Sequence, residues 1–426
     1  MMSKDGKVSR DAGMGTVVNH VGEGIHDKHS HQMPIYQTST FGFETVDDAA
    51  DVFAGRVKGY AYTRTHNPNY DHLANKIAYM EGIDLIKAHP DAEPHEIAMG
   101  KVTSSGMGAT SAAVLAHIGS GDKAIVQMGL YGNTFKFFNE MAPRLGIEVM
   151  WVSDTSRAGL ETAINAHPDA KLVFVETPSN PNLEVIDLKA LVSAAAQYPD
   201  MWVMVDNTFA TPYHQRPLNF GVDVVVHSTS KYISGHGQII GGAIVSTHLD
   251  YMHPGGSGVG LTYKMLGVAP SPKDTWLINN GLKTFEIRMQ RHAKNAQLIA
   301  EWLEARDEVK TVYYPGLPSN AGHQLAKAQM MNGFGGMLSF ELKDGKNGDA
   351  ENGKAFTNAL TVPTLAVSLG NVDSLIQHPA SMTHSATPKE EREMAGITDG
   401  IIRLSVGIEN VEDLIADLEQ AMGVVG

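Results

Sequence analysis

Six short apolar segments alternate with helical patterns between residues 124 and 246, and this alternation constrains the fold more than any other feature of the sequence. The segments lie at 124–128, 148–152, 172–176, 201–206, 222–227 and 241–246. Most are continuously apolar rather than alternating, which is typical of parallel strands buried on both faces. Between the third and fourth segments, Leu188, Leu191, Val192 and Ala195 repeat at helical spacing, as expected for a crossover helix. The pattern predicts an α/β fold with a mainly parallel sheet covered by helices.

The pattern changes near residue 275. Residues 283–305 form a long amphipathic helical pattern, and apolar runs at 309–315, 335–342 and 401–409 precede a closing helical pattern at 411–422. This order predicts a smaller C-terminal α+β domain at 275–426, after a large domain at 61–274. Residues 1–60 are rich in Gly, His and Asp around one extended apolar piece, so we expect an N-terminal arm that lies on another surface.

Composition excludes several classes of partner and chemistry. Lys and Arg total 33 against 47 for Asp and Glu, with no basic block, so nucleic acid is not an expected partner. No apolar stretch approaches the length of a membrane span, and the first residues lack the apolar core of a secretion signal, so we expect a cytoplasmic protein without a membrane partner. Cys is absent, which excludes disulfides and thiolate nucleophiles. Catalysis must therefore use Lys, Tyr, His, Arg or a cofactor.

The stretch HSTSKYISGHG carries the main chemical signal. A buried strand ends there, and a loop follows that contains Ser228, Ser230 and Lys231. Open α/β sheets bind ligands at strand ends. A lysine in that position can form an imine with an aldehyde cofactor, and the hydroxyls can donate to a phosphate. Taken alone, the stretch also fits a surface lysine in a polar turn.

Two other segments supply partners for such a cofactor. Asp206 ends a wholly apolar strand, where an unpaired carboxylate is costly to bury. The protonated pyridine nitrogen of pyridoxal-5′-phosphate (PLP) would pair with it, although a helix N-cap or a core ion pair would also explain it. Ser105, Gly106 and Met107 precede a helix of small residues, where free backbone N–H groups form an anion site.

Motifs along nearly the whole chain resemble those of the Cys/Met-metabolism PLP enzymes. This group contains methionine γ-lyase, cystathionine γ-lyase and γ-synthase, and O-acetylhomoserine sulfhydrylase, and the chain resembles the methionine γ-lyases in particular. The motifs are PIYQTSTF, YAYTRTHNP, SSGM, LYGNT, ETPSNP, VDNTF, HSTSKYISGHG, LIQHPASMTHS and AGITDGIIRLSVG. The resemblance implies the PLP-dependent transferase-like fold of aspartate aminotransferase, known as fold type I.

The resemblance also implies roles for individual residues. Lys231 would hold PLP as a Schiff base and remove the Cα proton, Asp206 would pair with the pyridine nitrogen, and Asn180 would donate to the ring oxygen. Tyr131 would stack on the ring and protonate the leaving γ-substituent, so that a 2-oxo acid and ammonia result. The residues expected to hold the phosphate are Gly106, Met107, Ser228 and Ser230.

Other implied roles concern a neighbouring subunit and the substrate. Tyr62 and Arg64 would reach the phosphate of a neighbouring subunit, which implies a homotetramer built from active-site-sharing dimers, with the N-terminal arm on the neighbour. Without that role the two residues belong to an ordinary polar loop. Arg403 alternates with apolar residues on a strand, and the resemblance assigns it the substrate carboxylate, assisted by Ser368. A structural salt bridge is the alternative for Arg403.

Departures from the methionine γ-lyase pattern leave the substrate open. Asn133 stands where most of those lyases have Cys, Lys264 aligns where a carboxylate is common, and residues 82–102 resemble an insertion. Val367 occupies the place of a Glu that meets the distal amine of cystathionine, which argues against cystathionine. We therefore expect γ-elimination from a methionine-like amino acid, with canavanine or an O-acylhomoserine as alternatives. In the last case sulfide would replace the ester to make homocysteine.

Histidines near the N-terminus suggest a metal site at first sight. The stretch HDKHSH contains His26, His29 and His31, and His236 lies near Lys231. The neighbouring motifs all belong to an organic cofactor, so we expect solvated loop histidines and no metal.

Overall fold

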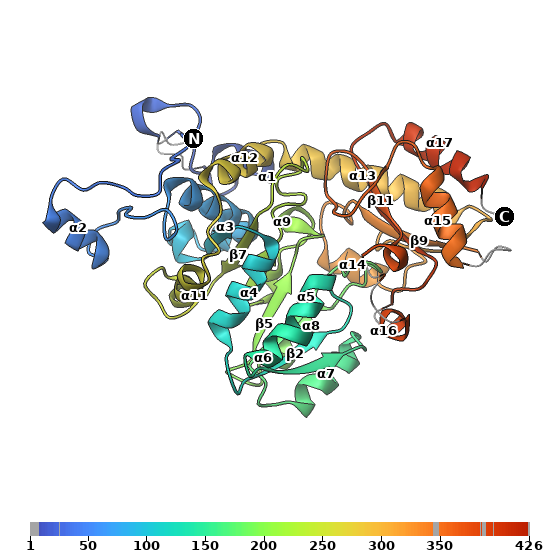
Figure 1. Ribbon diagram of the computed structural model, residues 1–426, viewed down its shortest axis with the longest axis horizontal. Coiled ribbons are helices and arrows are strands. Elements are labelled where there is room, and N and C mark those ends of the chain that lie inside the picture. Colours follow the sequence, from blue (N-terminus) through green and yellow to red (C-terminus); the bar gives the residue numbers. More distant parts are fainter. Residues whose placement is uncertain are drawn as a thin grey trace.

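The computed structural model describes residues 8–24, 26–343, 349–383, 385, 389–394 and 396–424, which form two sheets with their helices (Figure 1). The first sheet has the order β1-β7-β6-β5-β4-β2-β3. Its strands are β1 (Met99–Thr103), β2 (Lys123–Gln127), β3 (Glu148–Val152), β4 (Leu172–Glu176), β5 (Trp202–Asp206), β6 (Val224–His227) and β7 (Gly242–Ser246). Neighbours from β6 to β3 run parallel, whereas β7 runs antiparallel to both β1 and β6. The prediction of a mainly parallel sheet is confirmed.

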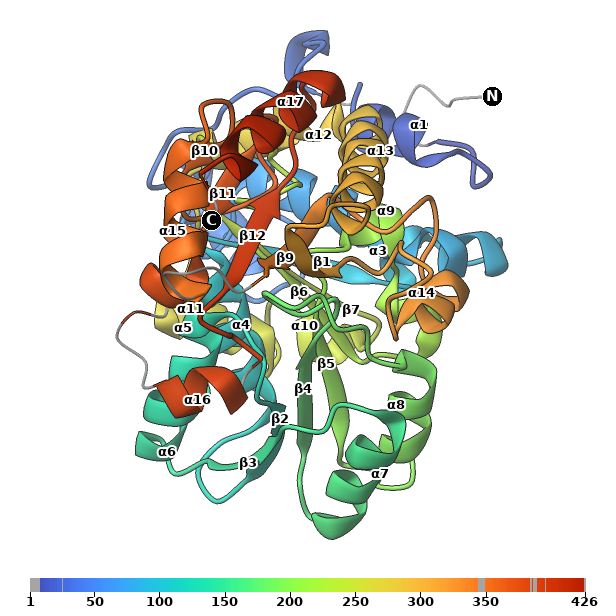
Figure 2. The same cartoon turned by 90° about the vertical axis from the view of Figure 1, so that its right-hand side faces the viewer.

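Helices cover both faces of this sheet. Those before residue 285 are α1 (Met14–His20), α2 (Val46–Phe53), α3 (Pro68–Ala88), α4 (Gly106–His117), α5 (Gly132–Lys136), α6 (Ala142–Arg144), α7 (Arg157–Ala166), α8 (Leu188–Ala195), α9 (Thr211–His214), α10 (Leu249–Met252), α11 (Val259–Leu266) and α12 (Pro272–Leu282). Figure 2 shows α7 and α8 on one side of the sheet and α4, α5 and α6 on the other. Each face has its own cluster of buried apolar side chains, which is why the strands are apolar on both faces.

The C-terminal part forms a second sheet with the order β10-β11-β12-β9-β8. Its strands are β8 (Val309–Tyr313), β9 (Met337–Leu342), β10 (Thr364–Leu365), β11 (Leu375–Gln377) and β12 (Ile401–Ser405). Its helices are α13 (Phe285–Glu304), α14 (His323–Gln329), α15 (Asp349–Ala359), α16 (Lys389–Met394) and α17 (Val411–Met422). The buried apolar side chains of α13, α17 and the central strands form a separate core cluster.

The predicted arm at residues 1–60 divides into two parts in the structure. Helix α1 buries Met14, Val17 and Val18 in the core cluster that includes α3 and α13 residues, so this part belongs to the body of the chain. Helix α2 buries none of its residues and projects from the body in Figure 1. Its Val46 and Phe53 are 85% and 76% exposed.

Residues 82–102, which resemble an insertion, extend the body on one edge. They contain the end of α3, a short 3-10 turn at Pro94–Glu96 and most of β1. Helix α3 starts at Pro68, directly after Asn67, whose side chain accepts a hydrogen bond from the Asn69 N–H at 3.0 Å. Strand β1 then pairs antiparallel with β7 and closes that edge of the first sheet. In the described part of the chain, no helix is long and apolar enough to cross a membrane.

A buried ionic cluster ties the N-terminal segment to the body. One Glu23 oxygen lies 3.0 Å from the Lys76 amine and 3.3 Å from the His72 ring, and the other lies 3.1 Å from the His26 ring. Lys76 is fully buried on α3 and also donates to Asn279 of α12 at 2.7 Å. Burial alone would raise the pKa of Glu23, but the hydrogen bond from His72 and the charge of Lys76 hold it well below its ordinary value.

We expect Glu23→Gln to lower the free energy of unfolding by about 3 kcal/mol at pH 7, because the substitution leaves the Lys76 charge buried without its partner. Equilibrium urea unfolding measures this difference, with Glu140→Gln on an exposed surface as the control. Since the pKa of Glu23 is depressed by folding, its contribution is present above about pH 4.5 and declines in more acidic solution. Equal stability of the two variants at pH 7 would contradict the prediction.

Candidate active site

Three neighbouring parallel strands bring polar residues to one edge of the first sheet. Strand β4 ends at Glu176, β5 ends at Asp206 directly opposite it, and β6 ends at His227, just before the loop that carries Lys231. The carboxyl ends of parallel strands in an open α/β sheet form its usual ligand crevice. The apolar strands therefore place these residues at a common site.

The amine of Lys231 lies within this site and has no carboxylate partner in the described part of the chain. Its Nζ donates a hydrogen bond to the Ser368 hydroxyl at 2.7 Å. Burial of the amine and the positive charge of Arg403 lower its pKa from 10.5 to about 8. An amine with this pKa is partly neutral near pH 7, as attack on an aldehyde requires.

Arg403 joins the two sheets at the site. It belongs to β12, is 5% exposed, and donates to the Asn180 side-chain oxygen at 2.9 Å and to the Ser368 carbonyl at 2.7 Å. Burial lowers its pKa to about 10. No carboxylate lies within ion-pair distance of its guanidinium among the described residues. A bound carboxylate would therefore supply the missing counter-charge in bidentate form.

Ser368 adopts a backbone conformation that is unusual for a residue with a side chain. Its φ is +86°, in the left-handed region that glycine prefers. Two hydrogen bonds hold it there, since its hydroxyl accepts from Lys231 and its carbonyl accepts from Arg403. A strained backbone persists only where the surrounding structure holds it, and such positions are concentrated at functional sites.

Glu176 is a site residue that the sequence did not single out. Its two oxygens accept hydrogen bonds from the Tyr131 N–H at 3.0 Å and the Asn180 N–H at 2.9 Å. Burial and the negative charge of Asp206 raise its pKa to about 8. The available sequence signal was its position in ETPSNP, at the end of a strand that pairs with the strand of Asp206.

These contacts form one continuous chain of hydrogen bonds around the site. The chain starts at the Lys231 amine and ends at Asn133, whose side-chain amide donates to the Tyr131 hydroxyl at 3.0 Å. Each residue in the chain is hydrogen-bonded to the next through a side chain or a backbone group. In order, its members are Lys231, Ser368, Arg403, Asn180, Glu176, Tyr131 and Asn133.

Asp206 lies beside this chain with one side available to a cofactor. Its carboxylate accepts a hydrogen bond from the Thr208 N–H at 2.9 Å, and burial raises its pKa. No Lys, Arg or His forms an ion pair with it among the described residues. A pyridine nitrogen that shares or carries a proton would satisfy this buried acid.

The predicted phosphate-binding residues lie side by side. Helix α4 begins at Gly106, and a Cβ there would be 2.8 Å from the Cβ of Ser228, so glycine is required for this approach. The N–H groups of Gly106 and Met107 belong to the first turn of a twelve-residue helix, which favours an anion. The Ser230 hydroxyl, in contrast, accepts from the Gly241 N–H at 3.0 Å and donates to the Gly241 carbonyl at 3.2 Å.

Tyr62 and Arg64 lie apart from the Lys231 site. The Arg64 guanidinium donates to the Lys264 carbonyl at 2.8 Å and lies 5.6 Å from the centre of the Tyr62 ring. In the residues that the structure describes, no hydrogen bond links either side chain to the chain from Lys231 to Asn133. Their predicted role toward a neighbouring subunit stays a prediction.

The mouth of the site consists of more exposed side chains. Tyr131 is 44% exposed and Val367, directly before Ser368, is 56% exposed. The expectation of solvated loop histidines holds for His29 and His31, which are exposed, but is wrong for His26, which is buried because its ring bonds to Glu23. The His236 Nδ1 donates to the Ser234 carbonyl at 2.6 Å, and no group of three or more His, Cys, Asp or Glu in the described ranges could hold a metal ion.

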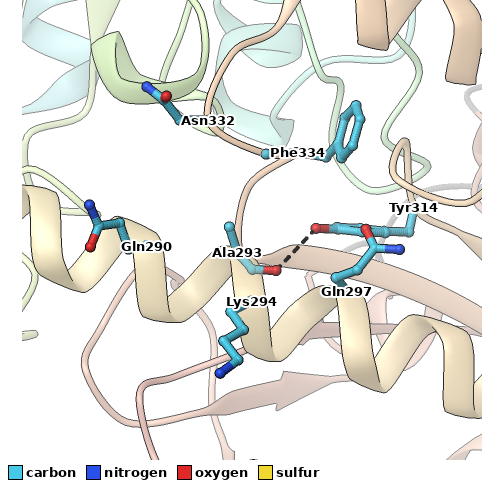
Figure 3. Close-up of a pocket in the computed structure, with 8 residues that line it drawn as sticks. Gln290, Ala293, Lys294, Gln297, Tyr314, Asn332 and Phe334 are labelled. Carbon is cyan, nitrogen blue, oxygen red and sulfur yellow. Dashed lines mark hydrogen bonds between the residues drawn. The ribbon is translucent and has the colours of Figure 1, made fainter.

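A separate surface pocket lies between α13 and the loop at residues 332–334 (Figure 3). Lys294 is its only charged lining residue, and the Tyr314 hydroxyl within it bonds to backbone carbonyls. None of the predicted site residues lines it. The chemistry therefore belongs to the strand ends and not to this pocket.

Comparison with known proteins identifies the family of the chain. The family described as "Cys/Met metabolism PLP-dependent enzyme" matches residues 15–423. The chain belongs to this family. It is 47% identical to an L-methionine γ-lyase of Fusobacterium nucleatum subsp. nucleatum over 97% of this chain and 98% of that protein. It is 41% identical to a cystathionine β-lyase of Lactococcus lactis subsp. cremoris, over 92% and 93% of the two chains.

A solved structure also resembles the whole chain. The cystathionine γ-synthase of Xanthomonas oryzae pv. oryzae, in complex with aminoacrylate and cysteine, matches with a TM-score of 0.86 and 37% identity, over 97% of this chain and 98% of that one. The fold-type-I prediction is confirmed. This member of the Cys/Met-metabolism family is a PLP-dependent enzyme, and the amine of Lys231, the acid of Asp206 and the start of α4 fit the aldehyde, ring nitrogen and phosphate of PLP.

We expect the rate of covalent PLP capture by the apoprotein to rise with pH, with a midpoint near pH 8, and to level off about one pH unit higher. The neutral Lys231 amine is the reactive form, and its lowered pKa makes about a tenth of it neutral at pH 7. Stopped-flow absorbance at visible wavelengths follows the reaction. Arg403→Met should move the midpoint upward because it removes a positive charge, whereas a midpoint near 10.5 in the unmodified protein would contradict the lowered pKa.

Proposed function

We propose that the protein eliminates the γ-substituent of a methionine-like L-amino acid. The observation that carries this proposal is the position of the partly neutral Lys231 amine next to Arg403, whose buried guanidinium has no carboxylate partner among the described residues. An amino acid whose carboxylate binds Arg403 brings its Cα near that amine. PLP, when bound, supplies the electron sink that makes the Cα proton acidic.

The side chains of the site divide the work between binding and proton transfer. Arg403 and the Asn180 amide orient the substrate through its carboxylate, and the Ser368 hydroxyl holds the Lys231 amine when it is free. The Lys231 amine takes the Cα proton, and the loss of a second proton from Cβ supplies the electron pair that expels the γ-substituent. The Tyr131 hydroxyl gives a proton to the departing γ-group, and the Asn133 amide, 3.0 Å away, holds that hydroxyl in place. Asp206 keeps the ring nitrogen protonated.

Methionine is the substrate that we propose first, because two relatives named L-methionine γ-lyases are 47% and 45% identical to this chain. Val367 is apolar and exposed at the mouth, so it offers no carboxylate to the distal amine of cystathionine. The second candidate is γ-replacement on an O-acylhomoserine, with canavanine as another γ-substituted substrate. The exposed polar Asn133 favours these polar leaving groups.

We expect methionine to yield 2-oxobutanoate and ammonia, and Lys231→Ala to abolish this product because the base and the cofactor attachment are both lost. The assay compares methionine, canavanine and O-acetylhomoserine, each with and without sulfide, and measures 2-oxobutanoate, homoserine and homocysteine. Homocysteine from O-acetylhomoserine with no 2-oxobutanoate from methionine would favour the replacement reaction. The absence of γ-chemistry on all three substrates would refute the proposal.

We further propose a homo-oligomer in which two subunits complete each site. The support is the projecting segment around α2, which exposes Val46 and Phe53 and is continuous with the loop of Tyr62 and Arg64. Large apolar side chains on a projecting arm are usually covered by a partner. A tetramer of such dimers and a cytoplasmic location remain predictions of the sequence.

Mixing two inactive variants tests the shared site. Lys231→Ala and Arg64→Ala subunits should each be inactive or nearly so, whereas co-refolded mixtures should recover up to about a quarter of the wild-type activity, because one site of each mixed dimer is intact. The control mixture pairs Lys231→Ala with a chain that carries both substitutions and should stay inactive. No recovery in stable mixed dimers would show that Arg64 does not serve the neighbouring site.

A further inference from the structure

Glu176 occupies a position between the two halves of the site. Its side chain accepts one N–H from Tyr131, which begins α5, and one from Asn180, which binds Arg403. The side chain of Tyr131, the residue before α5, makes no capping hydrogen bond to that helix. The Glu176 backbone N–H is itself bonded to the Gln127 side chain of β2 at 2.8 Å, so the carboxylate projects from a fixed point on the sheet.

A buried carboxyl group that links two loops costs desolvation free energy. Glu176 is 4% exposed, pairs with no Lys, Arg or His in the described ranges, and faces the like charge of Asp206 on the adjacent strand. Burial and that like charge both raise its pKa. Two backbone N–H groups compensate for part of this cost. A fold that needed only packing at this point would be more stable with an apolar residue.

We propose that Glu176 is a positioning residue that sets the distance between the Tyr131 ring and the Asn180–Arg403 pair. The proposal rests on the roles of Tyr131 and Arg403 in the proposed function. Through its two oxygens, one rigid group fixes both the segment that stacks on the cofactor and protonates the leaving group and the segment that orients the substrate carboxylate. A shift of either segment would separate the acid from the substrate.

Two substitutions separate position from charge. Glu176→Gln keeps the length but turns an NH2 group toward one of the two N–H groups, so one hydrogen bond is lost. Glu176→Asp keeps the carboxyl group beside Asp206 but is one methylene shorter, so its two oxygens cannot reach both N–H groups in the same way. Glu184→Gln is the matched control, because Glu184 lies in the same loop with an exposed side chain.

The measurements are kcat, KM, the circular dichroism of the visible PLP band, the PLP dissociation constant and the thermal unfolding midpoint. We expect both Glu176 variants to bind PLP and to show a reduced visible circular dichroism signal, because the Tyr131 ring no longer holds one orientation. We expect kcat to fall by about 10- to 100-fold with a smaller rise in KM, as for a misplacement near 1 Å. Glu184→Gln should match the wild type in all five.

Near-wild-type kcat and dichroism in Glu176→Asp would overturn the proposal, because a carboxyl group at any reach would then suffice. A loss of kcat in proportion to the loss of folded protein, with normal dichroism in the remainder, would also overturn it and indicate a structural role. If Glu176→Gln does not fold, Glu176→Asp decides the question. Failure of the proposed function is distinct, since it would appear as a wild-type enzyme without γ-chemistry.

Discussion

The hydrogen bonds of Arg403 are the contact on which the site depends. Arg403 lies in the C-terminal sheet, whereas Asn180 follows a strand of the first sheet, so the guanidinium joins the two parts of the chain at the point of chemistry. A buried guanidinium loses hydration, and its two hydrogen bonds to Asn180 and Ser368 recover only part of that loss. The remaining attraction is available to a carboxylate, which supports the role toward the substrate that we propose for Arg403.

The charges of the site are arranged in two layers. Lys231 and Arg403 lie on the side of the second sheet and of Ser368, whereas Glu176 and Asp206 end adjacent strands of the first sheet. Burial, together with the charge of Arg403 near Lys231 and of Asp206 near Glu176, favours the neutral forms, which lowers the pKa of Lys231 and raises the pKa of Glu176. A zwitterionic substrate and a cofactor with a protonated ring and a phosphate would neutralise both layers. The charges that lack partners in the protein are therefore arranged to match those of the bound substrate and cofactor.

The sequence predicted those elements whose signal is local. Continuous apolar runs identified β2 to β7, because strands buried on both faces need apolar residues at every position. Strand β1 was missed because Met99–Thr103 contains Gly100 and Lys101 and lies at an edge, where only its pairing with β7 defines it as a strand. Lys101 lies over the ring of Tyr263 at 5.1 Å, a contact that no sequence pattern shows.

The same distinction explains which site residues could be predicted. Lys231, Asp206 and Arg403 stand out because a charged residue at the end of an apolar strand needs a reason. Glu176 satisfies the same criterion, but its partners are backbone N–H groups of two distant loops, and backbone groups have no residue-type signal.

Relatives with different reactions, an L-methionine γ-lyase and a cystathionine β-lyase, are 47% and 41% identical to this chain. Overall similarity thus changes little between reactions, which is consistent with a choice of leaving group that depends on a few side chains at the mouth. Asn133 and Val367 are exposed there and belong to no core cluster, so substitution of either should cost little stability.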